Sequence, residues 1–121
     1  RAAREHQPLP DGSVIIVANY KAKLDAAGKP LARADGSWVE GEPQSYSGME
    51  ARAGWGEPVP ALLRNGNWHY NVFSADKTPN AALNQAACLA CHKPAVAHSF
   101  VFTHEALESA ALREGPARQH R

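Results

Sequence analysis

The sequence predicts a mainly β chain of the α+β class, in which an antiparallel sheet comes first and a few helices follow. β-Branched and aromatic residues gather in the first two-thirds of the chain, where pairs such as Asp-Gly and Asn-Gly separate them. The last third is rich in alanine and carries helix start and stop signals. We expect one domain over residues 1–121, with residues 1–9 as an N-terminal arm and residues 115–121 as a C-terminal tail.

The expected strands are separated by recognisable turn signals. Asp35-Gly36 suits a hairpin turn that interrupts a short strand, and Asn65-Gly66 is the strongest hairpin signal of the chain. The first strand is apolar on both faces at its start, before polar residues alternate along it. The strands are expected over residues 13–23, 31–38, 44–52 and 67–73.

Two helices are expected after the strands. Thr78-Pro79 predicts a helix start, because a hydroxyl at the N-cap precedes a proline at the first helical position. This helix should run over residues 79–93 and stop before Pro94. Beyond it we expect a short strand, then a helix that Thr103 caps and Gly115 ends, over residues 99–103 and about 104–114.

Composition excludes several classes of partner. The formal charge of +1, from 13 basic and 12 acidic residues, argues against a nucleic-acid or membrane-surface role. No apolar run approaches the length of a membrane span. The chain opens on Arg1 and has no apolar signal core, so we expect a processed product from which an export signal has been removed.

The main chemical signal is Cys-x-x-Cys-His, formed by Cys88, Cys91 and His92. This spacing attaches a c-type haem through two thioethers and supplies the adjacent histidine as an iron ligand. Both cysteines of the chain lie in the motif. A thioredoxin-like redox pair would require a βαβ frame, and half of a zinc site would require further ligands. The sheet-built chain would therefore carry haem c on a C-terminal helix, in a periplasmic compartment, because covalent haem attachment normally takes place outside the cytoplasm.

Four short segments, taken in order, resemble one family. Residues 10–15 resemble its opening strand, residues 54–56 its central Gly-Trp-Gly, and residues 87–93 its haem helix. Residues 99–103, Ser-Phe-Val-Phe-Thr, are similar to its closing Asp-Tyr-Val-Phe-Thr. The family is cytochrome P-460 with its sister, the beta-type cytochrome c-prime. The resemblance implies an antiparallel sheet fold, a five-coordinate haem with His92 as the proximal iron ligand, and a homodimer.

The resemblance also implies two possible functions. In the cytochrome P-460 branch a lysine is bonded to the haem, a distal carboxylate accepts protons, and hydroxylamine is oxidised to nitrous oxide or nitric oxide. Lys23, with Lys21 as the other possibility, falls where the cross-linking lysine is expected, and Glu50 where the carboxylate is expected. Electrons would pass to an external acceptor, another cytochrome. The alternative is a beta-type cytochrome c-prime-like binder of nitric oxide or carbon monoxide, but its phenylalanine cap is not expected here because all three phenylalanines lie late in the chain.

Each of these residues also has an ordinary explanation. A lysine near a strand end is commonly a solvated charge, and Glu50 could form a surface ion pair with Arg52 on the same strand face. Met49 could be a sixth iron ligand in a plain electron-transfer protein, although a core methionine is expected instead. The histidines outside the motif have no metal-ligand spacing and are expected in loops or on the surface: His6, His69, His98, His104 and His120.

Overall fold

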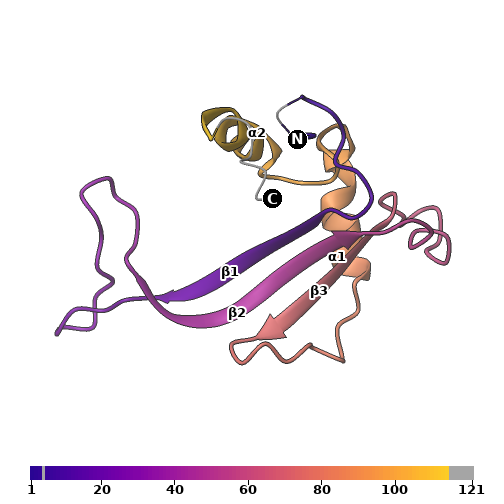
Figure 1. The fold of residues 1–121 in the computed structure, drawn as a ribbon. Helices are drawn as coiled ribbons and strands as arrows, with labels where there is room; N and C mark the ends of the chain where they lie inside the picture. The colour runs from indigo at the N-terminus through magenta and orange to yellow at the C-terminus, as the bar shows by residue number, and fades with distance from the viewer. Residues whose placement is uncertain (4, 115–121) are drawn as a thin grey trace, which may run out of the picture. The chain divides into compact units, whose positions relative to one another are not determined.

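A computed structural model describes residues 1–3 and 5–114. Three strands form one antiparallel sheet in the order β1-β2-β3, and two α-helices flank a 3-10 segment, η1, later in the chain (Figure 1). The expected mainly β, α+β class is confirmed. The elements are β1 Val14–Ala22, β2 Glu40–Ala51, β3 Trp68–Ser74, α1 Ala86–His92, η1 Lys93–His98 and α2 His104–Arg113.

Contacts divide the chain into two compact units. The described residues of the first unit are 1–3, 5–14, 50–69 and 84–114, with α1, η1 and α2. The second unit contains residues 15–49 and 70–83, with most of the length of the three strands.

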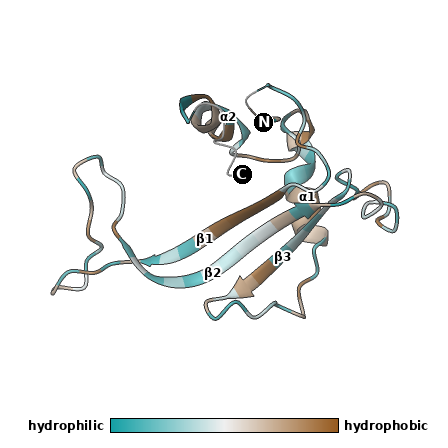
Figure 2. Cartoon of the chain, in the orientation of Figure 1, coloured by the Kyte–Doolittle hydropathy of each residue, from teal (hydrophilic) through white to brown (hydrophobic). Residues whose placement is uncertain are grey.

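In the second unit, strand pairing follows the alternation expected from the sequence. The apolar start of β1 is evident in Figure 2. The side-chain amide of Asn19 donates to the hydroxyls of Ser45 and Ser47 at 3.2 and 3.3 Å, so these three residues share one face of the sheet. Gly48 lies on the other face, where an added Cβ would meet Ile16 Cδ1 at 3.2 Å. Met49 is buried, as expected of a core methionine.

The region between β1 and β2 forms turns with little regular strand. The expected turn is present, because Arg33 N–H donates to the Ser37 carbonyl at 2.7 Å and Gly36 has a φ of 85°. The expected strand over residues 31–38 is reduced to an isolated antiparallel bridge between Ala32 and Trp38. Few residues flank the turn, which leaves little length for a continuous ladder.

The helix predicted to start at Thr78-Pro79 begins instead at Ala86. The chain after β3 folds back on that strand: Pro79 forms an antiparallel bridge with Phe73, and Asn80 N–H donates to the Val72 carbonyl at 2.8 Å. The prediction was wrong at this end because backbone pairing with β3 competes with the local helix signal. The predicted C-terminal end of the helix, at residue 93, is one residue beyond the observed end of α1 at His92.

In the first unit, the chain beyond α1 continues through Pro94 as η1. The strand predicted over residues 99–103 is absent, because Ser99 and Phe100 take left-handed φ values of 55° and 63° and end extended pairing. The last helix is confirmed as α2, with Thr103 as its N-cap residue but without a side-chain cap hydrogen bond. Gly115, expected to end it, lies outside the described residues.

The core of the first unit is small and includes polar side chains. Apolar Ala3, Ala51, Trp68, Leu89 and Val101 are buried there. Asn65 and His104 are buried with them, so the expectation of a surface position was wrong for His104. No helix in the described part of the chain is long and apolar enough to cross a bilayer.

Candidate functional site

Helix α1 carries the whole Cys-x-x-Cys-His motif. Residues three apart lie near one another on a helix surface, so Cys88 and Cys91 fall on neighbouring turns of one face. The two cysteines are not paired in a disulfide; Cys88 is half-buried and Cys91 is exposed. Leu89 between them is buried and anchors the helix in the core. The helix is thereby fixed on one side and keeps both thiols available for chemistry.

The imidazole of His92 is held by a backbone carbonyl. Its Nδ1 lies 2.7 Å from the Phe100 carbonyl oxygen, which can only accept, so the ring donates from Nδ1. In the neutral ring the lone pair is then on Nε2, and a neutral imidazole with a lone pair is the form of histidine that ligates a metal. A histidine that binds a metal typically donates its other nitrogen to a carbonyl or carboxylate in this way. The ring of Phe102 packs on His92, with centroids 4.5 Å apart.

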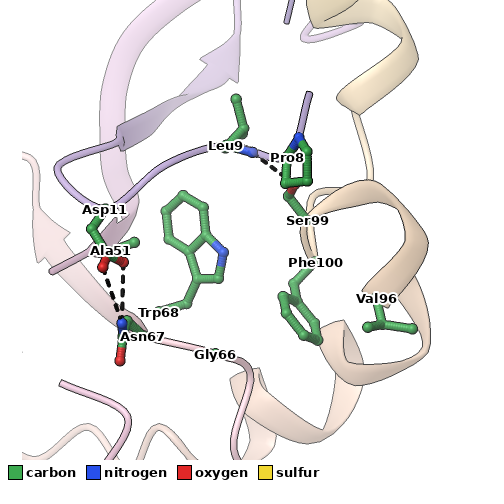
Figure 3. A pocket seen from close by; sticks show the side chains of 10 residues that line it. All are labelled: Pro8, Leu9, Asp11, Ala51, Gly66, Asn67, Trp68, Val96, Ser99 and Phe100. Carbon is green, nitrogen blue, oxygen red and sulfur yellow. Dashed lines mark hydrogen bonds between the residues drawn. The ribbon is translucent and has the colours of Figure 1, made fainter. Parts of the chain in front are cut away.

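The carbonyl that fixes His92 lies in a strained segment. Ser99 and Phe100 are consecutive non-glycine residues in the left-handed region, each at a cost of about 1–2 kcal/mol. Phe100 N–H donates to the Ala95 carbonyl at 2.9 Å, and Leu9 N–H donates to Ser99 Oγ at 3.0 Å. Leu9 and Ser99 line a pocket of about 270 Å³ together with Trp68 and Phe100 (Figure 3). The strained segment is therefore held by one local hydrogen bond, to Ala95, and by one from a distant part of the chain, from Leu9.

Asn65 fixes the middle of α1 from outside the helix. Its side chain is 1% exposed, and its Nδ2 donates to the Leu89 carbonyl at 2.9 Å. Lys93 adds a second link, because its Nζ donates to the Arg64 carbonyl at 3.0 Å. Sequence reasoning recognised Asn65 only as a turn residue. No local signal marks its second role, because the hydrogen bond joins residues 24 apart.

The Gly-Trp-Gly segment contacts the same turn as Asn65. A Cβ on Gly56 would lie 2.0 Å from the Gly66 carbonyl oxygen, so only glycine fits there. Gly56 N–H donates to Asn67 Oδ1 at 3.0 Å, and Asn67 Nδ2 donates to both carboxylate oxygens of Asp11 at 3.2 Å (Figure 3). This close approach holds the turn that carries Asn65.

Glu50, the predicted proton acceptor, lies in the first unit near the end of β2. Its side chain is 31% exposed, and its Oε1 accepts from Arg52 Nε at 2.7 Å and lies 2.6 Å from Arg52 Nη2. The Arg52 guanidinium in turn lies 5.6 Å from the centre of the Trp55 ring. The ion pair given above as the ordinary alternative is therefore present, and both guanidinium contacts use one carboxylate oxygen.

Lys23, the predicted cross-linking residue, lies in the second unit directly after β1. Its backbone N–H donates to the Val39 carbonyl at 2.8 Å, and its carbonyl accepts from Leu31 N–H at 2.8 Å. Lys21 belongs to the same unit, and both residues are exposed. The structure brings the cysteines and His92 together on α1, and Lys23 forms its backbone contacts in the other unit.

The helix residues fit a haem. Two cysteines at the required spacing precede a histidine whose Nδ1–H donates to a backbone carbonyl. The part of the chain that the structure describes contains no cluster of His, Cys, Asp and Glu suited to holding a metal ion by itself. A helix with this motif in a chain with an antiparallel sheet is typical of sheet-built cytochromes, as distinct from the all-helical cytochromes. Residues 1–103 match the family described as Cytochrome P460, and the chain belongs to that family.

Family membership makes the chain a haem protein, with iron, of a family associated with haem oxidoreductase activity. The resemblance noted in the sequence is confirmed. A search of curated proteins finds no match.

Proposed function

We propose that the protein binds haem covalently and oxidises hydroxylamine to nitrous oxide or nitric oxide. The proposal of a covalent haem rests on the hydrogen bond that His92 Nδ1–H donates to the Phe100 carbonyl, because His92 lies on the helix that bears both cysteines. Cys88 and Cys91 would form the thioethers, and His92 would bind the iron through Nε2. Family membership supports the oxidative activity.

Glu50 would remove protons from the substrate. A bound haem would supply the redox chemistry that takes electrons from the hydroxylamine nitrogen. Each electron that leaves is matched by a proton that a nearby base must take. The Arg52 contacts of Glu50 both go to Oε1 and orient the carboxylate, which leaves Oε2 as the oxygen for proton transfer. Protons would pass on to water and electrons to an external acceptor cytochrome.

Lys23 would supply the cross-link to the haem. The side chains of Lys23 and Lys21 are both exposed, so substitution of either is expected to leave the fold intact. Mass spectrometry of the haem peptides from the wild type, Lys23→Arg and Lys21→Arg decides between them. A third attachment that is lost only in Lys23→Arg supports the assignment. Haem peptides joined only through Cys88 and Cys91 would contradict it.

The test of the activity is Glu50→Gln, with Glu42→Gln, an exposed residue on the same strand, as its control. Loss of hydroxylamine turnover is expected in Glu50→Gln, because the amide cannot accept a proton, while hydroxylamine still binds to the ferric protein. Glu42→Gln should turn over as the wild type does. Equal turnover in both variants would exclude Glu50 as the base.

A second candidate is a binder of nitric oxide or carbon monoxide. Phe73 lies against β2, since an added Cβ on Gly48 would be 3.7 Å from its ring, and a largely apolar hollow is lined by Ile16, Tyr46, Phe73 and Lys77. Phenylalanine against the second strand was not expected from its late position in the sequence. The optical spectrum separates the candidates: an ordinary c-type spectrum with rapid gas binding favours this one, and a six-coordinate low-spin spectrum indicates electron transfer.

We further propose a periplasmic location and a homodimer. The location rests on the proposed covalent haem, and the dimer on the family resemblance alone. Cell fractionation tests the first, and light scattering of the haem-loaded protein tests the second.

A further inference from the structure

The segment after η1 has an unusual backbone. Ser99 and Phe100 both have positive φ although neither is glycine, and side chains disfavour that region. Two such residues in succession persist only where surrounding contacts hold them. This segment places the Phe100 carbonyl oxygen 2.7 Å from His92 Nδ1. The strained conformation is therefore coupled to the orientation of the histidine.

The contact on Ser99 comes from the N-terminal arm. Leu9 N–H donates to Ser99 Oγ at 3.0 Å, across 90 residues of sequence (Figure 3). Leu9 lies between Pro8 and Pro10, and proline restricts the residue before it to extended conformations. The donor is thus presented by a stiff segment. Residues 1–9 were expected only as an arm, and this part of the arm is tied to the histidine-bearing region.

The arm is also fixed just beyond Leu9. The Asp11 carboxylate accepts from Asn67 Nδ2, and the Ser13 carbonyl accepts from Ala51 N–H at 3.0 Å. These contacts belong to the same compact unit as α1. A displacement at Ser99 would therefore not be absorbed by free movement of the arm.

We propose that Ser99 is a positioning residue for His92. Its hydroxyl, held by the Leu9 N–H, keeps Ser99 and Phe100 left-handed and so aims the Phe100 carbonyl at Nδ1. The proposal rests on the proposed role of His92 as the iron ligand. An acceptor on Nδ1–H raises the basicity of Nε2, which strengthens the bond to iron and favours the ferric state.

The test uses the haem-loaded protein and two spectroscopic readouts. In Ser99→Ala the acceptor for Leu9 N–H is lost, so the iron–histidine stretching frequency of the ferrous form should fall and the reduction potential should rise. Ser99→Asp keeps a short acceptor, and aspartate tolerates the left-handed region, so both values should stay near the wild type. Ser109→Ala, at an exposed position on α2, is the matched control.

Two further variants keep the test decisive. Ser99→Gly relaxes the backbone strain but lacks the hydroxyl. If the Leu9–Ser99 hydrogen bond orients His92, the stretching frequency and the reduction potential should shift as they do in Ser99→Ala. Leu9→Pro removes the N–H from the other partner and should shift both values in the same direction, even where a Ser99 variant loads too little haem. Values equal to the wild type in Ser99→Ala and Leu9→Pro would overturn the proposal.

Failure of this proposal is distinguishable from failure of the proposed function. If the shifts appear but hydroxylamine is not oxidised, the positioning role stands and the proposed activity falls. If His92→Ala keeps the wild-type iron–histidine band, His92 is not the ligand and the positioning role is overturned with it.

Discussion

Replacement of Asn65 by alanine should destabilise the protein through the helix that carries the cysteines. The side chain is 1% exposed, and its Nδ2 donates to the Leu89 carbonyl at 2.9 Å. α1 has only seven residues, too few for a stable isolated helix, so it depends on contacts from outside. Asn65→Ala removes one such contact from the turn between the cysteines.

The size of the effect follows from two losses. An intramolecular hydrogen bond contributes about 0.5–1.5 kcal/mol net, and the Leu89 carbonyl keeps its bond from Lys93 N–H, so no buried acceptor is left unpaired. Removal of the amide from a fully buried position adds a cavity cost of about 1–2 kcal/mol. The expected loss is about 2–3 kcal/mol, which lowers Tm by about 10 °C for a domain of this size.

Urea and thermal unfolding measure this loss, with Asn71→Ala as the control. Asn71 is exposed on β3, and its substitution should change the free energy of unfolding by less than about 0.5 kcal/mol. Asn65→Asp should be at least as damaging as Asn65→Ala, because a buried carboxylate would face the Leu89 carbonyl. If Asn65→Ala and Asn71→Ala unfold alike, the role of Asn65 in holding α1 is refuted.

Two further predictions concern a close backbone approach and a surface carboxylate. Gly56→Ala should cost about 3–5 kcal/mol in urea unfolding, because its Cβ would lie 2.0 Å from the Gly66 carbonyl oxygen. Gly28 has a φ of 78° but open space around it, so Gly28→Ala should cost only about 1–2 kcal/mol. Equal losses of unfolding free energy in Gly56→Ala and Gly28→Ala would contradict the steric explanation. The Ser74 hydroxyl and Thr78 N–H donate to Asp76 and hold its pKa below the ordinary value. The stability that the ionised Asp76 contributes is therefore complete above the unfolded pKa of about 4 and is lost as pH falls through the lowered pKa of the folded state. Between neutral and acid pH, the free energy of unfolding should fall less in Asp76→Asn than in the wild type. Parallel pH profiles of the two proteins would contradict this prediction.

The three main strands could be predicted because their signal is local. Alternation and β-branched residues act within a few positions, so the strand over residues 13–23 was found at Val14–Ala22. The N-cap signal at Thr78-Pro79 is equally local, but the same residues pair with β3. Where a local preference competes with pairing to another segment, the outcome depends on free energies that the local pattern does not contain.

The motif residues were identified because their chemistry depends on spacing along the chain. Cys88, Cys91 and His92 follow one another within a single helix, so sequence order is enough to predict their nearness. The roles of Asn65 and Ser99 were not predicted. Each depends on one hydrogen bond to a distant residue, and neither residue type is unusual in a turn.

By itself the sequence determined the sheet-building strands, the Cys-x-x-Cys-His motif and the family, because these depend on residue types at short spacing. Only the tertiary structure decided which nitrogen of His92 holds the proton, through the Phe100 carbonyl, and what supports α1, through Asn65. Hydrogen bonds are directional and short-ranged, so partners far apart in the chain are known only once folding has brought them within about 3 Å.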